Sequence, residues 1–178
     1  MTDPATDPAT EPEASRPYMP GYGVQPPEQG TGLLPWTWAL SRLRNSHDFW
    51  LATVWPDGRP HLTPVWAVWD DGGLWFSASP GSRKVRNIRA GCRVAMSTED
   101  PENPVVLEGI AELVTDHERL VRFVAVVNVK YRTEYPVEFF APDQAVVAKV
   151  RPERAFGVVS TDFDGSPTRW TFPSVSSG

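Results

Sequence analysis

The chain has 178 residues, a formal net charge of -5 and one cysteine, Cys92. This length suits one well-buried domain rather than two. The acidic balance argues against nucleic acid as the main partner. A single cysteine excludes an internal disulfide and fits a reducing cytosol. Because no apolar run approaches the roughly 20 residues that span a bilayer, we expect a cytoplasmic protein without a membrane partner.

The N-terminal part predicts no packed structure. Residues 1–17 are acidic and rich in proline, and they lack the basic and apolar regions of a signal peptide. We expect them to form a disordered tail, since this composition buries too little apolar surface to become ordered. Residues 18–34 are rich in Gly, Pro and aromatic side chains. They predict an extended arm that lies on the domain or on a partner subunit, and the folded domain is expected over 35–173.

The first half of this domain predicts one short helix followed by strands. Trp36, Leu40 and Leu43 recur at helical spacing and predict a helix over 36–44. Apolar runs separated by turn residues then predict strands at 49–55, 60–69 and 74–79. Pro64 cannot donate a hydrogen bond to a ladder, so it predicts a sheet edge or a bulge.

The second half continues in the same manner. The expected elements are a basic helix ending at Gly91, strands at 92–98 and 105–114, a helix from about 115 to 130, a helical turn within 135–140, strands at 145–151 and 155–161, and a strand-like tail within 166–173. Six or seven short strands with a few helices indicate a small, mainly antiparallel β-barrel.

The segment 79–89 contains a local electrostatic conflict. Ser79 is expected to cap a helix whose first turn contains Pro80. Arg83 and Lys84 then lie in or next to that turn, where the helix dipole disfavours cations. A bound phosphate or another anion would compensate for this conflict. The alternative is a solvated amphipathic helix that is basic without binding anything.

Other titratable residues give weaker indications. His47, His61 and His117 are far apart and show no metal-ligand spacing, so no metal site is predicted. His61 fits either a cleft or a surface position on its strand. Glu108 is expected on an exposed strand face rather than in a cleft.

Several segments in order carry a family resemblance. They are Arg-Pro-His at 59–61 with Pro-Val-Trp at 64–66, Leu-Trp-Phe-Ser at 74–77, Ser-Arg-Lys-Val-Arg-Asn at 82–87, the strand 106–111 and Thr-Arg-Trp-Thr-Phe at 168–172. Together they resemble the pyridoxamine-5′-phosphate-oxidase-like split β-barrel superfamily over about residues 35–172. The similarity is strongest to its actinobacterial branch of flavin and deazaflavin oxidoreductases that uses coenzyme F420. It implies a homodimer with this FMN-binding fold and with two cofactor sites in clefts between subunits.

The resemblance also implies which residues bind the cofactor. Arg83 and Lys84 match the basic pair that holds the phosphate. Hydroxyl and amide donors around that pair are Ser77, Ser79, Ser82 and Asn87. The strand beneath the flavin or deazaflavin ring is Leu62, Thr63, Pro64, Val65 and Trp66. Arg169 and Trp170 match a C-terminal pair that reaches across from the other subunit, so Trp66 and Trp170 are expected to supply aromatic walls.

The function implied is redox chemistry carried by the cofactor, with no catalytic side chain. The leading expectation is an oxidoreductase that passes a hydride from reduced F420 to a conjugated small-molecule substrate. One alternative is an FMN-binding oxidoreductase of the same family. Another is a non-catalytic protein that binds a cofactor or haem on the same fold. Pyridoxamine-phosphate oxidase activity itself is disfavoured, because the strand 62–67 lacks a clear match to that enzyme's basic residues.

Overall fold

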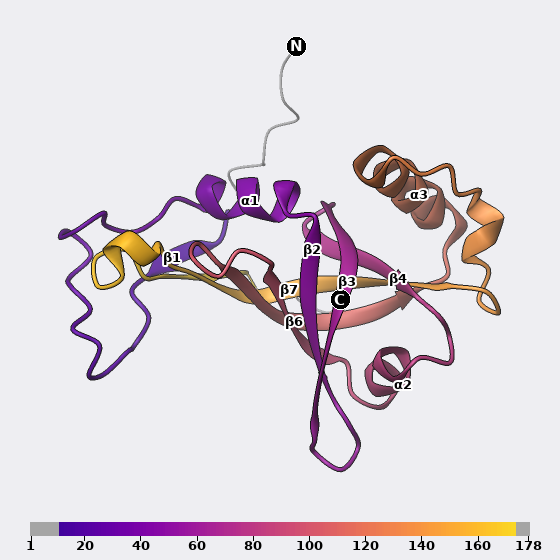
Figure 1. The fold of residues 1–178 in the computed structure, drawn as a ribbon, viewed down its shortest axis with the longest axis horizontal. Helices are drawn as coiled ribbons and strands as arrows, with labels where there is room; N and C mark the ends of the chain where they lie inside the picture. Colours follow the sequence, from indigo (N-terminus) through magenta and orange to yellow (C-terminus); the bar gives the residue numbers. More distant parts are fainter. Residues whose placement is uncertain (1–10, 174–178) are drawn as a thin grey trace.

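The computed structural model of the chain describes residues 11–173 (Figure 1). Its elements are β1 (Glu13–Ser15), α1 (Trp36–Asn45), β2 (Asp48–Val54), β3 (Pro60–Asp70), β4 (Gly73–Ala78), α2 (Arg83–Ala90), β5 (Arg93–Thr98), β6 (Val105–Val114), α3 (His117–Tyr131), the 3-10 turn η2 (Val137–Phe140), β7 (Val146–Gly157), the 3-10 turn η3 (Ser160–Asp162) and β8 (Thr168–Thr171). No helix within this range is both long enough and apolar enough to cross a membrane.

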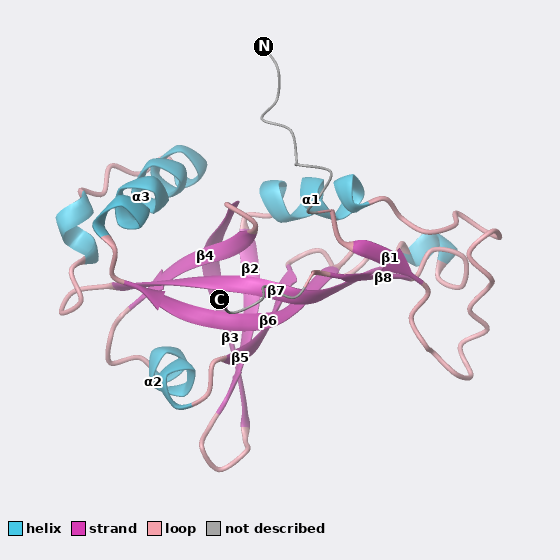
Figure 2. Cartoon of the chain, turned by 180° about the vertical axis from the view of Figure 1, so that it is seen from behind, coloured by secondary structure: helices cyan, strands magenta, loops and turns pink. Residues whose placement is uncertain are grey.

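The strands form one antiparallel sheet that closes on itself. Strands β7, β4, β3, β2, β5 and β6 are neighbours in that order, and β6 pairs again with β7 to complete a six-stranded barrel. The last residues of β7 also pair with β8, and β8 pairs with β1. These two short strands prolong the sheet beside α1 (Figure 2). The prediction of a mainly β fold, a split β-barrel with a few helices, is therefore confirmed.

Strand β7 is longer than expected. Two strands were predicted, at 145–151 and 155–161, whereas the structure has a single strand across both. Pro152 lies within it, opposite Gly109, where the register with β6 shifts and forms an irregularity. This shift accommodates a residue that has no N–H to donate. A Cβ atom at Gly109 would collide with the carbonyl of Arg151, so the close approach of the two strands there requires glycine.

Part of the expected N-terminal tail is ordered. Residues 1–10 lie outside the described range, but Glu13–Ser15 forms β1, in which Ala14 pairs with Trp170. The guanidinium of Arg16 then donates to the carbonyls of Gly165 and Pro167, both at 2.7 Å. The prediction of disorder over 1–17 is thus wrong for this strand. Backbone hydrogen bonds to β8 and the side chain of Arg16 hold this strand. Amino-acid composition cannot predict either contact.

The arm 18–34 has no regular helix or strand and lies against its own chain. Gln25 donates to the carboxylate of Asp164 at 2.9 Å, and the N–H of Leu34 donates to Thr168 at 2.9 Å. Of the two expected positions, on the domain or on a partner subunit, the structure therefore has the first. These contacts fix the arm to the segment before β8 and to the first residue of β8.

Two apolar clusters stabilise the fold. The first fills the barrel, where Phe49, Phe76 and Leu107 pack together and α1 closes one end. The expected core residues of α1 are all buried, namely Trp36, Leu40 and Leu43. The second cluster lies outside the barrel, where α3 packs on one part of its outer face, next to β4 in Figure 1. The outer face therefore has two parts, one covered by α3 and one left open.

Candidate cofactor site

The barrel is split along one edge of β3. This strand pairs with β2 from Pro60 to Trp66, but with β4 only from Ala67 to Asp70. The edge that faces away from β2 is therefore unpaired along residues 60–66, as far as the described residues show. Pro64 lies in this stretch, which confirms the predicted sheet-edge position.

The hydrogen bonds of Ala67 show which backbone groups of β3 point to the open edge. Its N–H donates at 2.8 Å to the hydroxyl of Tyr131, which in turn donates at 2.7 Å to the carbonyl of His47, just before β2. The hydroxyl thus continues the ladder on the β2 side. Because directions alternate along a strand, the backbone N–H groups of Leu62 and Trp66 point to the open edge. Backbone donors at such an edge suit the polar rim of a flat ligand.

Helix α2 begins later than predicted. Ser79 is not its cap: a turn in which the N–H of Ser82 donates to the carbonyl of Ser79 at 3.0 Å precedes the helix. Ser82 is the N-cap residue and makes no side-chain capping bond. Arg83 and Lys84 are the first two helical residues, and the first turn contains no acidic residue. The predicted conflict between cations and the helix dipole is therefore present in the structure.

Most of the charges that act on Arg83 at the start of α2 are positive, and Asp57 is the one acidic group acting on it within the described residues. Neither Arg83 nor Lys84 forms an ion pair with any residue in the range 11–173. Partial desolvation, followed by repulsion from Arg86 and Arg59, lowers the pKa of Arg83 from its usual value. An arginine stays protonated under these conditions. This end of the barrel therefore carries excess positive charge that a phosphate would neutralise.

A buried chain of hydrogen bonds links α2 to both neighbouring strands. Asn87 is fully buried and donates to the hydroxyl of Thr53 at 3.0 Å, and that hydroxyl lies 3.3 Å from Nδ1 of His61. Asn87 was predicted among the cofactor-binding donors, but its burial directs it into the protein. It positions the start of α2 on β2 and β3. Its Oδ1 and the Oγ of Ser82 are buried without a partner among the described residues.

The predicted ring strand divides between the two faces of the sheet. Val65 is buried in the barrel, and Thr63 and His61 are half-buried on the same side. Leu62, Pro64 and Trp66 are exposed on the outer face. The open edge between these two faces is continuous with the end of β4, where Ser77 and Ser79 lie. The structure thus brings together the unpaired strand, the β4 end and the basic helix start.

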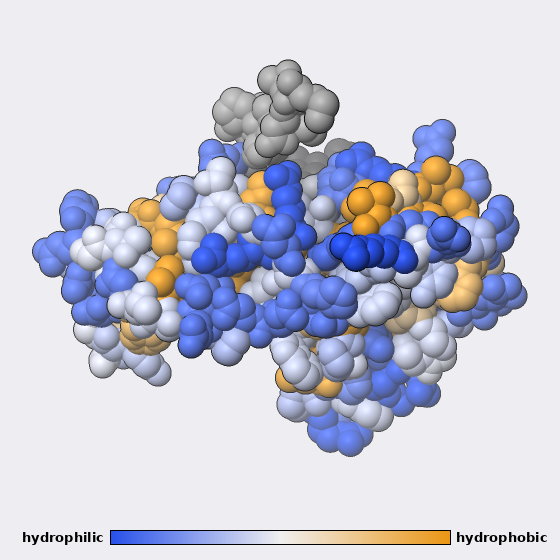
Figure 3. Space-filling model, turned by 45° about the horizontal axis from the view of Figure 1, so that its top comes forward, coloured by the Kyte–Doolittle hydropathy of each residue, from blue (hydrophilic) through white to orange (hydrophobic). Residues whose placement is uncertain are grey.

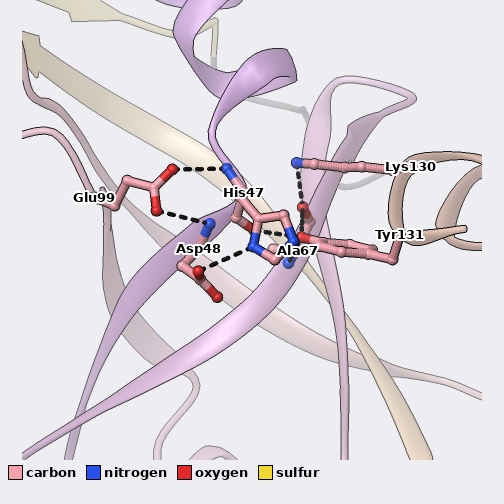
Figure 4. A network of polar contacts seen from close by, with 6 residues as sticks. All are labelled: His47, Asp48, Ala67, Glu99, Lys130 and Tyr131. Atoms are coloured by element: carbon pink, nitrogen blue, oxygen red, sulfur yellow. Dashed lines mark hydrogen bonds and ion pairs between the residues drawn. The ribbon is translucent and has the colours of Figure 1, made fainter.

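Two residues outside the predicted cofactor-binding set hold the far end of β3. Figure 4 shows Tyr131 and Lys130 converging on Ala67, and Lys130 Nζ donates to the Ala67 carbonyl at 2.7 Å. Burial lowers the pKa of Lys130 to about 8 and raises the pKa of Tyr131 to about 12. The Tyr131 ring stacks on Trp66 at 4.5 Å between centroids. The sequence predicts only that these residues end an amphipathic helix. It does not predict which strand the end of that helix contacts.

Arg169 and Trp170, the predicted C-terminal pair, point to opposite faces of β8. Trp170 is fully buried, stacked 6.4 Å from Trp38 between ring centroids and edge-on to Trp36 at 5.6 Å. The expectation that Trp170 forms a cofactor wall is corrected: alternation along β8 directs its ring into the core. Arg169 points to the outer face, where it lines a hollow of about 330 Å³ with Glu108 and four other residues.

The rest of the outer face exposes large apolar side chains. Trp50 and Val54 of β2 and Leu62 and Trp66 of β3 are all exposed, on paired strands. On α3, Val121 and Val129 are exposed as well, and orange patches lie on the side of Figure 3 where α3 lies. Large apolar side chains gathered on one exposed sheet face indicate a contact surface for another molecule.

Comparisons with known proteins agree with this geometry. The family described as pyridoxamine 5′-phosphate oxidase matches residues 39–159. Among solved structures, an F420 reductase is 30% identical with a TM-score of 0.53, covering 65% of this chain and 93% of its own. A conserved hypothetical protein from Mycobacterium tuberculosis is 27% identical with a TM-score of 0.57, covering 80% of this chain and 89% of its own. A search of curated proteins finds no match.

More distant structures share the fold alone. An FAD-binding protein from Mesorhizobium loti is 21% identical with a TM-score of 0.56, covering 78% of this chain and 96% of its own. The closed sheet with its open β3 edge defines a split-barrel protein. The chain belongs to the pyridoxamine 5′-phosphate oxidase family.

Proposed function

We propose that this protein is an oxidoreductase that binds F420 and passes a hydride from it to a conjugated organic substrate. One observation carries the proposal: Arg83 and Lys84 begin α2 with no ion-pair partner among residues 11–173, next to the open edge of β3. This arrangement fits a ligand with an anionic tail and a flat body that has polar edges.

The residues of the chain bind and orient the cofactor. Arg83 and Lys84 hold the phosphate through charge-assisted bonds, with the hydroxyls of Ser77 and Ser79 beside them. The backbone edge of 62–66 lies along the ring, and Trp66 limits its position because Tyr131 fixes the indole. When bound, F420 supplies the hydride chemistry, and the protein contributes position and exclusion of water.

The proposal includes a homodimer. The exposed apolar face of β2 and β3 is suited to a second copy of itself, since isologous contacts are the commonest in soluble oligomers. In such a dimer Arg169, half-buried on the outer face of β8, is available to the partner's cofactor cleft. The exposed, unpaired thiol of Cys92 is compatible with a cytoplasmic location.

F420 is preferred to FMN because the neighbour with 30% identity is an F420 reductase. No side chain of the open edge imposes this choice by its own chemistry. FMN binding by the same residues is therefore the alternative that the experiment must separate, together with cofactor binding without turnover.

The test is a titration of the purified protein with F420 and with FMN, in which fluorescence measures binding. We expect tight F420 binding that Lys84→Ala weakens by about 1.5–3 kcal/mol, the range for a charged hydrogen bond. Arg44→Ala, which removes an exposed cation from α1, serves as the matched control. If the protein binds FMN and not F420, the proposed cofactor is wrong and FMN takes its place. Oxidation of reduced F420 by a panel of enones tests the chemistry, and binding without turnover would make the protein a carrier.

A further inference from the structure

The tip of the β2–β3 hairpin places two cations on one aromatic ring. The guanidinium carbon of Arg83 lies 3.5 Å from the centroid of the Trp55 ring, and that of Arg59 lies 4.3 Å from the same centroid. Both distances are within the range of a cation–π contact, for which tryptophan is the strongest partner. The ring therefore connects the hairpin to the first residue of α2.

Trp55 is held in place by the hairpin turn. Its N–H donates to the carbonyl of Arg59 at 2.8 Å, and its carbonyl accepts from the N–H of Gly58 at 2.9 Å. Gly58 has a φ of 87°, a conformation that favours glycine. Because both backbone groups of Trp55 are hydrogen-bonded within the turn, its ring offers a defined surface to the arginine stacked on it.

This stacking leaves the donors of Arg83 unused. Arg83 makes no hydrogen bond and no ion pair within residues 11–173, so its guanidinium is oriented by the ring alone. Arg59 is bound through Nε to Asp57 at 2.8 Å, which leaves its terminal nitrogens free. The two guanidinium groups repel each other, and the nearby carboxylate of Asp57 offsets this repulsion at Arg83 only in part, so a further anion is favoured there.

We propose that Trp55 and Arg59 belong to the phosphate site: Trp55 is a positioning residue that orients Arg83, and Arg59 is a second contact to the anion. This inference rests on the proposed function and deepens it, because neither residue was among those implied by the family resemblance. It assigns the preference for a phosphorylated cofactor to the hairpin as well as to the helix.

A second stack in the same chain shows what a structural pair of this kind looks like. The guanidinium of Arg42 lies 3.7 Å from the centroid of Trp38, and Arg42 donates to the Trp38 carbonyl at 3.2 Å. That arginine has an acceptor within its own helix. Arg83 has the stack but no acceptor, which leaves its donors available to a ligand.

The test compares ligands with and without a phosphate. Calorimetric titrations with FMN, F420, inorganic pyrophosphate and riboflavin are made on the full chain and on Trp55→Ala, Trp55→Tyr, Arg59→Gln and Arg42→Gln. We expect Trp55→Ala and Arg59→Gln to weaken binding of the phosphorylated ligands roughly tenfold. Riboflavin affinity stays unchanged, Trp55→Tyr restores most of the loss, and Arg42→Gln behaves as the unmodified chain.

The outcomes separate this inference from the proposed function. If the unmodified chain binds F420 or FMN and Trp55→Ala leaves the affinity for each phosphorylated ligand unchanged, the inference is wrong and the proposed function stands. A parallel loss for riboflavin makes Trp55 a structural residue and also overturns the inference. If the unmodified chain binds none of the phosphorylated ligands, including pyrophosphate, both are overturned.

Discussion

The two parts of the barrel's outer face differ although one strand crosses both. On β3, Leu62 and Val68 lie on the same outer face, yet Leu62 is 62% exposed and Val68 only 1%. Val68 is covered by α3, together with Trp75 of β4. Leu62 is covered by nothing within the described chain. Trp66 lies at the boundary, stacked on Tyr131 at the end of α3.

This difference shows which part of the surface the chain completes by itself. Where α3 packs, apolar residues on the sheet meet apolar residues on the helix, and both become buried. Where α3 ends, residues of the same chemical kind remain exposed beside the open edge of β3. The covered part therefore contributes to the stability of the single chain, whereas the open part is the surface available to the proposed dimer.

The largest effect is expected in the covered part. Phe123 of α3 packs against Trp75, with 6.4 Å between ring centroids, and is almost fully buried. Phe123→Ala should lower the free energy of unfolding by about 3–5 kcal/mol, measured by urea denaturation. The control is Val129→Ala on the same helix, where the side chain is 82% exposed, and a change within about 0.5 kcal/mol is expected. Equal effects for the two variants would contradict the assigned packing of α3.

The open part should respond in association rather than in folding. Leu62→Asp places a charge on the exposed face, and we expect it to weaken the proposed dimer by about 2–4 kcal/mol, the range for a central interface residue. Sedimentation velocity at several protein concentrations measures this shift. Unfolding of the isolated subunit should change by less than about 0.5 kcal/mol. A wild-type chain that stays monomeric at all concentrations would remove the dimer from the proposal.

Sequence patterns predicted the elements with strong periodicity. Apolar residues fall on both alternations of 61–69, a pattern that predicts coverage of both faces, and the structure confirms this for Val65 inside and Val68 outside. The alternation could not say that the same outer face is covered at one end and open at the other. That depends on the length of α3 and on where Tyr131 docks, which are long-range contacts without a local signal.

The site was predicted in part for the same reason. The cationic start of α2 could be recognised because helix electrostatics are local. The burial of Trp170 and Asn87 could not be recognised, because a sequence motif does not say whether a side chain faces a ligand or the core. The stack of Arg83 on Trp55 joins a hairpin and a helix far apart in sequence, so no spacing rule detects it.

A smaller effect is expected at the boundary between the two parts. Tyr131→Phe removes the hydroxyl that accepts from the N–H of Ala67 and donates to the carbonyl of His47. Two backbone groups then lose a partner, which should lower the free energy of unfolding by about 1–3 kcal/mol. Hydrogen exchange at the Ala67 amide should accelerate while amides in β6 keep their protection. Unchanged exchange at Ala67 would show that the Tyr131 hydroxyl does not protect this amide.

The smallest effect is a dependence on pH at the same boundary. Burial lowers the pKa of Lys130 to about 8 from 10.5, with Glu99 and Asp48 opposing that shift. Between these two values the unfolded chain binds more protons than the folded chain, so this group makes stability rise with pH from about 8 upward. The pKa of Tyr131, raised by burial to about 12, acts in the opposite direction only above pH 10. Urea denaturation between pH 7 and 9.5 therefore isolates Lys130. The difference in unfolding free energy between the wild-type chain and Lys130→Met should change with pH across this range in favour of the wild type, and a constant difference would mean that Lys130 titrates as an exposed lysine.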